Sequence, residues 1–556
     1  MRPIYALVGQ NSLSKLNEIC ETMKFETLKQ IYDNSISRFG QRPSFSMFER
    51  ESLTYNDLAD RVDYVREMLL GAGVGGGDKV VLLSGNMPTW PVCYFACVTA
   101  GIVVVPVLPD FSGEELDKII AHSEAKALMV SDKLYAKLSA ATLKRMNIVL
   151  RTKNLGVISR RSKSLAKAIE PKPDDLAAII YTSGTTSSPK GVMLSHSALA
   201  TQVQMYPEFF PIYPDDVFLS LLPLSHTYEC SIGMLYPFSA GASVVYMDRP
   251  PTASALMPAF RAVRPTIILS VPLIIEKIYR SQVLARFTRT RFLAALYSTG
   301  IIRRALHGIA GVALKKLFGG RVRFFGIGGA KLDRSAEQFM RDAHFPYAIG
   351  YGLTETAPLL FGAAPSKTRL QSGGYALSGI EYRLEDVNAS TGEGELVVKT
   401  PCIMKGYYKN PEATAEAFTA DGWFHTKDLC TISSDGYMTV HGRANNMIIG
   451  ASGENIYPEE IESVINTHRL VTESIVVADH GTLVALVELD KDKIEQSLRD
   501  FHGNVSARME EITRDIREYV NSRVSKFSRV SVVVEQPGGF EKTPTHKIKR
   551  FLYKRQ

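Results

Sequence analysis

The chain begins with an alternation of helical and strand-like hydrophobic patterns. Residues 52–73 place apolar side chains at helical spacing and end in glycines, which predicts a helix that stops there. Residues 78–85 (DKVVLLSG) are typical of a buried strand, and residues 114–132 repeat the order of helix and then strand. This repetition predicts α/β layers with parallel strands over the first 170 residues.

The most apolar segment is VCYFACVTAGIVVVPVL, at residues 92–108. Gly101 and Pro106 interrupt it, and it is shorter than the roughly 20 residues that a membrane-spanning helix needs. We therefore expect a buried helix that leads into a buried strand.

The pattern changes around residues 373–441, where short strand-like runs alternate with Gly, Asp and Asn turns. This texture predicts a small antiparallel β unit. A tail with mixed helix and strand signals follows Arg443 and ends in a basic run. We expect a large N-terminal domain over residues 1–442, which includes the β unit, and a small C-terminal domain over residues 443–556.

Composition and charge narrow the class of protein. Of the 556 residues, 45% are apolar and 22% are charged, which is typical of a globular enzyme and excludes collagen and a long disordered chain. The 65 basic and 57 acidic residues give a net charge of +8, an excess too small to indicate a nucleic-acid partner. This charge is compatible with anionic small molecules or an anionic membrane surface.

The cysteines and the N-terminus bear on location. Six cysteines occur without a CxxC spacing, so we expect neither a disulfide framework nor a zinc site, and we infer a reducing compartment. The N-terminal segment lacks the sustained apolar core of a signal peptide. These features predict a cytoplasmic protein, either free or peripheral at a membrane.

The strongest chemical signal is AAIIYTSGTTSSPKGVMLSH, at residues 177–196. An apolar strand runs into a loop of small hydroxyl residues, whose N–H and O–H groups can donate to phosphate oxygens while Lys190 adds positive charge. The segment is not a Walker A loop, because Gly191 and Val192 follow Lys190. We expect six residues to bind phosphate: Thr182, Ser183, Gly184, Thr185, Thr186 and Lys190.

This segment resembles the phosphate loop of the adenylate-forming (AMP-binding) superfamily, which includes acyl-CoA synthetases, luciferases and peptide-synthetase adenylation domains. Ser187 stands where the family usually has Gly. The resemblance implies an α/β fold: a large N-terminal domain of α/β layers with a β-barrel-like subdomain, and a smaller, mobile α+β C-terminal domain. It also implies that a carboxylic acid reacts with ATP, with Mg²⁺ as cofactor, and that coenzyme A then accepts the acyl group.

Two further segments resemble family signatures in the expected order. Phe325–Leu332 looks like the adenine-side loop, and the resemblance assigns nucleotide contacts to Gly328, Gly329 and Ala330. Tyr351–Thr356 looks like the next signature. Tyr351 offers a flat face for a purine, Thr354 offers a hydroxyl for the α-phosphate, and Glu355 offers a hard oxygen for Mg²⁺. The resemblance also places Gly352 among the nucleotide-binding residues.

The segment DGWFHTKD resembles the one whose final carboxylate, here Asp428, binds both ribose hydroxyls. Lys427 replaces the usual Gly. Arg443 looks like the ribose-contacting arginine before the domain hinge, and Asn445 stands at the position where the family has Asp or Lys.

Two segments of the tail complete the resemblance. SGENIYPEEIE looks like the loop that faces the active site during thioester formation, where Gly453 leaves room for the pantetheine arm. KTPTHKIKR looks like the segment with the lysine of adenylation. This role falls to Lys547, and His546 occupies the usual Gly position. The resemblance assigns catalysis to Lys547, Glu355, Thr182 and Lys190. We expect the neighbouring Lys549, Arg550 and Lys554 to form a solvated basic tail.

His226 and Tyr228 lie in PLSHTYE, and the resemblance places this turn at the acyl site. The alternative for a lone histidine is a structural hydrogen bond. Residues 280–323 contain ten Arg or Lys and no acid, interleaved with apolar residues. This stretch resembles an insertion of long-chain acyl-CoA synthetases. It suits either a membrane-surface or tunnel-lid element or a basic helical pair on a soluble face.

Three hypotheses about function remain. The first is a long-chain fatty acid–CoA ligase that forms an acyl-adenylate, releases pyrophosphate and then makes acyl-CoA and AMP. The second is an enzyme that loads an acyl carrier protein. The third is a catalytically weak protein that binds acyl groups or nucleotides.

Overall fold

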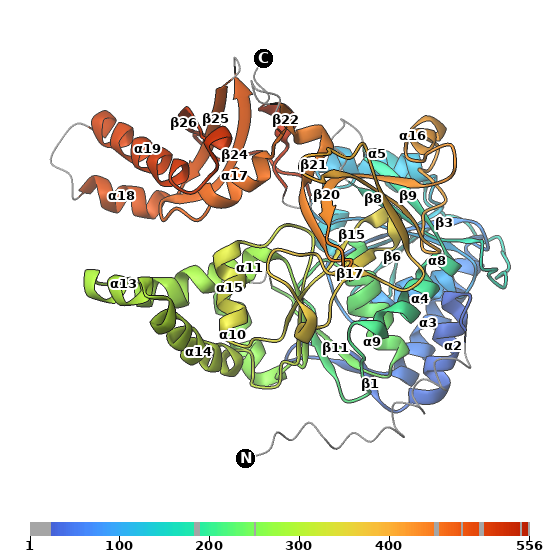
Figure 1. Ribbon diagram of the computed structural model, residues 1–556. Coiled ribbons are helices and arrows are strands. Elements are labelled where there is room, and N and C mark those ends of the chain that lie inside the picture. Colours follow the sequence, from blue (N-terminus) through green and yellow to red (C-terminus); the bar gives the residue numbers. More distant parts are fainter. Residues whose placement is uncertain are drawn as a thin grey trace.

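We describe the fold from a computed structural model, for residues 24–182, 189–249, 252–449, 455–479, 482–499, 505–544 and 547–553. The large domain contains two seven-stranded sheets, and the C-terminal domain sits against it beside the antiparallel strands β20 and β21 (Figure 1).

The first large sheet is mostly parallel, with an antiparallel strand at each edge. In spatial order its strands are β7 (Val157–Arg160), β6 (Ile148–Arg151), β5 (Ala127–Val130), β3 (Lys79–Leu83), β4 (Val103–Pro106), β8 (Leu176–Thr182) and β9 (Lys190–Ser195). The predicted parallel layering of the first 170 residues is therefore confirmed. The pair β8 and β9 flanks the segment with the strongest chemical signal.

The second large sheet continues the alternation. Its strands are β14 (Tyr347–Ile349), β13 (Phe324–Ile327), β12 (Ile267–Ser270), β10 (Val217–Leu219), β11 (Ser243–Tyr246), β1 (Pro43–Met47) and β2 (Ser52–Thr54), in spatial order. All neighbours pair in parallel except β1 and β2. The loop after β13 therefore emerges at the carboxyl edge of this sheet, where ligands of α/β folds bind.

Helices fill the space between the two sheets and cover their outer faces. The central layer consists of α2 (Leu28–Phe39), α3 (Tyr55–Gly71), α4 (Thr89–Val98), α8 (His196–Met205) and α9 (Tyr236–Ser239). The first sheet is covered by α5 (Gly113–Ser123), with α6 (Asp132–Tyr135) and α7 (Ala140–Arg145) nearby, and the second by α10 (Ala253–Val263), α11 (Pro272–Ile278) and α15 (Arg334–Asp342). Alternate side chains of each strand thus enter different cores: Val80 and Leu82 of β3 face the centre, and Val81 and Leu83 face α5.

The apolar segment 92–108 forms α4 and β4, as predicted. All residues of both elements are buried, since helix and strand lie inside the central layers. Among the described residues, no helix is both long enough and apolar enough to cross a membrane. The cysteines at 93, 97, 230, 402 and 430 are buried free thiols.

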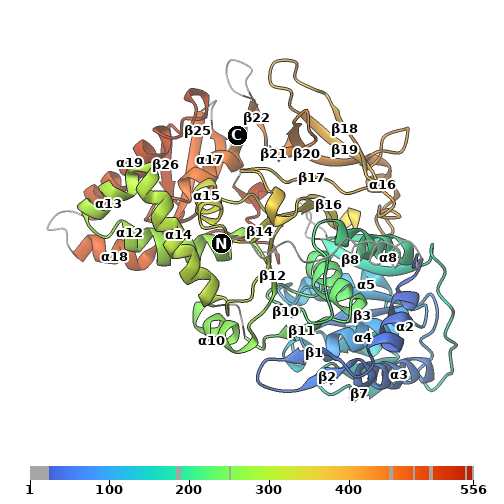
Figure 2. The same cartoon turned by 60° about the horizontal axis from the view of Figure 1, so that its bottom comes forward.

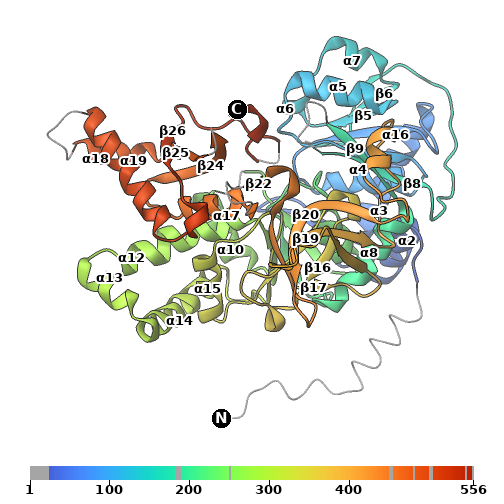
Figure 3. The ribbon, with the colours of Figure 1, turned by 45° about the horizontal axis from the view of Figure 1, so that its top comes forward.

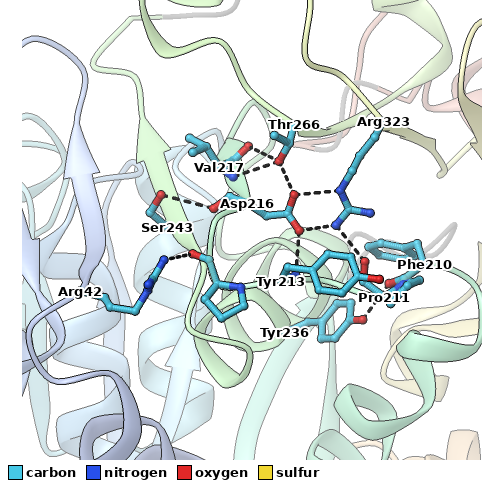
Figure 4. Close-up of polar contacts among 11 residues, drawn as sticks. Arg42, Phe210, Pro211, Tyr213, Asp216, Val217, Tyr236, Ser243, Thr266 and Arg323 are labelled. Atoms are coloured by element: carbon cyan, nitrogen blue, oxygen red, sulfur yellow. Dashed lines mark hydrogen bonds and ion pairs between the residues drawn. The ribbon is translucent and has the colours of Figure 1, made fainter. Parts of the chain in front are cut away.

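A buried carboxylate ties the second sheet together at the starts of its strands (Figure 4). Asp216 precedes β10, and its Oδ1 accepts hydrogen bonds from Thr266 Oγ1 at 2.7 Å and Arg323 Nε at 2.8 Å. Thr266 and Arg323 precede β12 and β13. Burial would raise the pKa of Asp216, but the bonds from Arg323, Tyr213 N–H and Thr266 lower it, so the charged form holds three strand starts in register.

The segment after the second sheet is antiparallel. Three short strands, β15 (Tyr351–Gly352), β16 (Leu359–Gly362) and β17 (Tyr375–Ala376), precede a four-stranded sheet of β18 (Glu381–Glu385), β19 (Gly394–Lys399), β20 (Phe424–Ile432) and β21 (Met438–Arg443). The short helix α16 (Pro411–Glu416) lies between β19 and β20. Strands β17 to β21 match the small β unit expected around residues 373–441, while β15 and β16 show that the antiparallel region begins earlier, at Tyr351.

The C-terminal domain has its own core. A sheet of β24 (Val471–Asp479), β25 (Thr482–Leu489) and β26 (Val532–Glu535) packs against α17 (Pro458–Ile465) and α19 (Val505–Asn521). The hairpin of β22 (Ile448–Ile449) and β23 (Asn455–Ile456) precedes α17, and α18 (Lys491–Arg499) follows β25. This α+β arrangement confirms the expected class of the small domain.

The basic insertion is helical. A π-helical turn, Tyr279–Leu284, leads into α12 (Ala285–Phe287), α13 (Arg291–Ser298) and α14 (Gly300–Leu317). These helices extend from the edge of the large domain on the side where the C-terminal domain sits (Figures 1, 2 and 3). A buried chain of hydrogen bonds joins Tyr279, Tyr297, His307 and Asp342, which anchors the insertion to α15.

Candidate functional site

Tyr351, Asp428 and Arg443 form the centre of the site, although they come from three separate strands. The Tyr351 hydroxyl donates to Asp428 Oδ2 at 2.6 Å, and Arg443 Nε lies 2.7 Å from Asp428 Oδ1. Asp428 and Arg443 are direct partners in the pairing of β20 with β21. Burial raises the pKa of Asp428, while the Arg443 charge and the Tyr351 hydrogen bond oppose this rise.

Lys427, beside Asp428, adopts a left-handed backbone conformation with φ of 61°. This region of φ favours glycine, which explains why glycine suits the position. Lys427 lies near a β-bulge, because the register of β20 against β21 shifts between residues 429 and 430. The backbone therefore keeps the kink that presents Asp428 although the residue is lysine.

Glu355 lies in the 3₁₀ turn Thr354–Thr356 and faces the phosphate-loop strands. The Tyr407 hydroxyl donates to Glu355 Oε1 at 2.9 Å, and Lys190 Nζ lies 5.0 Å from the centroid of the Tyr407 ring. Lys190 pairs with Thr182 across β8 and β9. In the described part of the chain, Oε2 of Glu355 accepts no hydrogen bond, and no group of three or more potential ligands could hold a metal ion. A hard cation at Glu355 would therefore take its other ligands from phosphate oxygens.

Lys547 reaches the same site from the C-terminal tail. Its segment is held by Thr543, whose N–H donates to Lys547 O at 2.7 Å and whose Oγ1 accepts from Lys547 N–H at 3.2 Å. The Lys547 side chain has solvent access but is surrounded by protein, and this desolvation lowers the pKa of its ammonium group; Arg443 lowers it further, while Asp428 and Glu355 raise it. The charges of Asp428 and Glu355 thus act on Lys547, although neither of these described carboxylates forms a direct ion pair with it.

Tyr228 lines an apolar cavity next to this site, and His226 lies in the same turn without lining the cavity. Tyr228 N–H donates to His226 Nδ1 at 3.2 Å, and burial, together with the Lys547 charge, lowers the pKa of His226 to about 4. A Cβ at Gly328 would lie 3.3 Å from the Tyr228 ring, so Gly328 lets the ring approach the loop after β13. The cavity is small, with a volume of about 30 Å³, and is lined by Tyr228, the ends of β12–β14 and the aromatic pair Phe210 and Phe324.

A sequence model described as AMP-binding enzyme matches residues 32–408, and one described as AMP-binding enzyme C-terminal domain matches residues 445–555. The chain belongs to the AMP-binding enzyme family.

Curated relatives of this AMP-binding enzyme are distant but extensive. A long-chain-fatty-acid–CoA ligase of Mycobacterium bovis is 28% identical over 82% of this chain and 81% of its own length. The peroxisomal long chain acyl-CoA synthetase 7 of Arabidopsis thaliana is 28% identical over 90% of this chain and 79% of its own. A chloroplastic long-chain-fatty-acid–[acyl-carrier-protein] ligase of the same plant is 25% identical over 95% of this chain and 85% of its own length.

Solved structures share the fold. The ATP-bound MatB of Rhodopseudomonas palustris superimposes with a TM-score of 0.74 at 24% identity, covering 94% of this chain and 98% of that one. The resemblance inferred from the sequence motifs is confirmed at the level of family and fold.

The structure describes most of the residues that we expect at the site of this AMP-binding enzyme. Gly329 adopts φ of 86°, and Gly352 has no room for a side chain, because a Cβ there would lie 1.8 Å from Pro358 O. Ala330 follows in the same loop, and Thr354 lies in the turn with Glu355. Five expected residues lie outside the described part of the chain: Ser183, Gly184, Thr185, Thr186 and Gly453.

Two features of the site escaped the sequence reasoning. Tyr407, the donor to Glu355, belongs to no motif that we singled out, and only its place in the aromatic pair of KGYYK marks it. The assignment of Arg550 to a solvated tail is wrong, because its guanidinium pairs with Glu462, a buried carboxylate of α17. Arg550 therefore anchors the segment that carries Lys547.

Proposed function

We propose that this AMP-binding enzyme joins a fatty acid to the α-phosphate of ATP, releases pyrophosphate, and then transfers the acyl group from AMP to the thiol of coenzyme A. One observation carries the proposal: Lys547, Asp428, Glu355 and Arg443 interact at one place although they come from both domains. A carboxylate and a triphosphate repel each other, so their reaction requires concentrated positive charge and fixed positions.

The family resemblance then gives each residue a role in the proposed reaction. Lys547 neutralises charge on the attacking carboxylate and the α-phosphate. Thr182 and Lys190 hold the outer phosphates, together with Ser183, Gly184, Thr185 and Thr186. Mg²⁺, when bound at Glu355, neutralises charge on the phosphate oxygens. Asp428 still has free lone pairs for the ribose hydroxyls after it accepts from Tyr351 and Arg443.

The remaining contacts concern the base and the acyl group. Tyr351 and the segment Gly328–Ala330 border the adenine, with Gly352 and Thr354 next to the α-phosphate. His226 and Tyr228 position the fatty carboxyl group at the mouth of the apolar cavity, and Gly453 leaves room for the pantetheine arm. The apolar lining supports an aliphatic substrate, and the long-chain ligases among the relatives support a long one.

The acceptor decides between this function and its alternative. A carrier-protein ligase among the relatives supports a pantetheine-bearing protein as a second candidate. We propose a screen of fatty acids of graded length with Mg·ATP, in which pyrophosphate and the acyl product are measured with coenzyme A or with a holo-carrier protein. Formation of acyl-CoA and AMP supports the first function. Turnover with the carrier protein only replaces it with the second.

A third outcome would show that the protein binds ATP but does not catalyse the reaction. Four residues depart from the family pattern: Ser187, Lys427, Asn445 and His546. Tight ATP binding without pyrophosphate exchange for any acid would overturn the enzymatic proposal and favour a binding protein.

We also propose a reducing, cytoplasmic location with peripheral contact to an anionic membrane through residues 280–323. Four apolar side chains of α13 and α14 are 68–84% exposed: Phe292, Ile301, Ile309 and Val312. They lie among basic residues, and this combination favours an anionic lipid surface over a solvated helical pair.

Sedimentation with vesicles rich in phosphatidylserine tests the membrane proposal. We expect salt-sensitive binding that Ile301→Asp with Ile309→Asp reduces at least about fivefold. Leu165→Asp, at an exposed residue elsewhere, is the matched control. If the protein does not bind vesicles at low ionic strength, or if the control variant loses as much binding, the membrane proposal is contradicted. The helices would then be an ordinary basic pair exposed to solvent.

We place the domain boundary at residues 442–443, since β21 ends at Arg443 and the turn Ala444–Asn446 leads to the small core. The family resemblance implies that the small domain turns about this point between the two half-reactions, and Gly453 and Lys547 then face the site alternately.

A further inference from the structure

A salt bridge joins the two domains beside the proposed nucleotide loop. Lys331 Nζ, directly after Ala330 in the large domain, lies 3.0 Å from Glu460 Oε1 in the first turn of α17. His441 Nδ1 of β21 lies 3.5 Å from the same oxygen. The Lys331 and Glu460 side chains are 29% and 44% exposed, so solvent screens the pair only in part.

The neighbouring contacts show that this turn of α17 meets several parts of the large domain. The Tyr457 hydroxyl donates to Glu393 Oε2 at 2.7 Å, and the Tyr457 ring lies 5.5 Å from the His441 ring. Glu459 Oε1 accepts from Asn446 Nδ2, in the connecting turn, at 2.7 Å. These contacts define one orientation of the small domain.

The same helix also determines where Lys547 lies. Glu462 is buried, accepts a hydrogen bond from Val476 N–H at 2.6 Å and pairs with Arg550. Arg550 follows Lys547 by three residues, so a shift of α17 moves Lys547 away from Asp428 and Glu355. Contacts at the start of α17 therefore control whether the ammonium group reaches the phosphates.

We propose that Lys331 and Glu460 are positioning residues that hold the small domain in the orientation that forms the adenylate. The pair separates when the small domain presents its other face for thiol transfer. Because Lys331 follows the nucleotide loop directly, this contact also links the loop to the orientation of the domain. The inference rests on the proposed function for its two half-reactions.

Charge reversal tests the pair. Lys331→Glu and Glu460→Lys each place like charges at the contact, and the double variant restores opposite charges. We expect each single variant to slow acid-dependent ATP–pyrophosphate exchange about tenfold and to leave CoA-dependent consumption of synthetic acyl-adenylate within about twofold of wild type. The double variant should recover exchange to within about threefold. Glu114→Lys, which breaks the exposed pair of Glu114 with Lys118 on α5, is the matched control and should change neither step.

A second measurement does not depend on substrate. Spin labels at Phe527 and Ile309, both exposed, report the distance between the small and the large domain. Each single reversal should broaden the distance distribution, and the double variant should narrow it again.

The inference is overturned if both half-reactions fall equally, if exchange is unchanged, or if the double variant is no better than the single ones. The wild type could also be inactive with every acid while the charge reversals still change the distance between the domains as expected. That result would contradict the proposed function and would still support the role of Lys331 and Glu460 in holding the small domain.

Discussion

The phenol of Tyr407 donates a hydrogen bond to Glu355 across a gap of 52 residues, with an O–O distance of 2.9 Å. The bond fixes one carboxylate oxygen and leaves the other without a hydrogen bond among the described residues, where we propose that Mg²⁺ binds. Lys190 lies against the ring of Tyr407, so one tyrosine orders both the proposed metal ligand and a phosphate-binding lysine.

Tyr407→Phe removes this hydrogen bond and keeps the ring beneath Lys190. We expect the Mg²⁺ concentration for half-maximal adenylate formation to rise roughly tenfold, because loss of an outer-shell partner weakens metal affinity by about this factor. Titration of pyrophosphate exchange with Mg²⁺ measures the effect. The matched control is Tyr408→Phe, because the hydroxyl of Tyr408 donates to Glu124 and not to Glu355. Equal Mg²⁺ dependence in the two variants would contradict the role of Tyr407.

Lys547→Ala should separate the two half-reactions. The charges of Asp428 and Glu355 act on the ammonium group, which we propose neutralises phosphate charge, so its loss should slow adenylate formation by a factor of about 100 or more. Thiol attack on synthetic acyl-adenylate should remain largely intact. Single-turnover assays of each step check this expectation, and equal damage to both would show that the roles are not divided. Lys549→Ala, two residues along the same segment, is the control.

The backbone at Lys427 supplies a test that concerns stability alone. With φ of 61°, residue 427 should accept glycine easily and a β-branched residue poorly. We expect Lys427→Gly to melt at least as high as wild type, and Lys427→Val to be less stable than Lys427→Gly by about 1–2 kcal/mol. At Thr439, in the regular strand β21, the order of stability should be reversed, so that Thr439→Val is more stable than Thr439→Gly. The same order at both positions would contradict the strained backbone.

The sequence predicted the parts of the site that depend on local order. Tyr351, Asp428 and Arg443 were assigned from their motifs, and they meet because strands β15, β20 and β21 bring them together. Lys547 was assigned from its motif in the C-terminal tail. The bond from Tyr407 to Glu355 and the pair of Lys331 with Glu460 could not be predicted, because tertiary packing brings together segments that are 52 and 129 residues apart. The prediction that Arg550 lies in a solvated tail was wrong for the same reason. The basic run itself does not indicate that Arg550 pairs with the buried carboxylate of Glu462 in the folded protein.

Glu229 provides a prediction about pH. This residue follows the acyl-site turn and is 1% exposed, and its Oε2 has no hydrogen-bond partner among the described residues. Burial raises the pKa of its carboxyl group to about 8, against the lowering effect of a hydrogen bond with Ser220. In the unfolded chain the pKa is near 4.5. Between pH 4.5 and 8 the folded protein therefore holds a proton that the unfolded chain releases, and stability falls as the pH rises through this window.

Glu229→Gln removes this titration and keeps the shape of the neutral acid. Relative to wild type, the variant should gain about 1 kcal/mol of stability per pH unit between pH 5 and 8, seen as a growing difference in melting temperature. Glu412→Gln, at an exposed residue of α16, should show no such trend. A difference in melting temperature that stays constant with pH would mean that Glu229 is already ionised in the fold. The uncharged form matters for function, because an ionised carboxylate so close to Tyr228 would repel the fatty carboxylate that we place at the mouth of the same cavity.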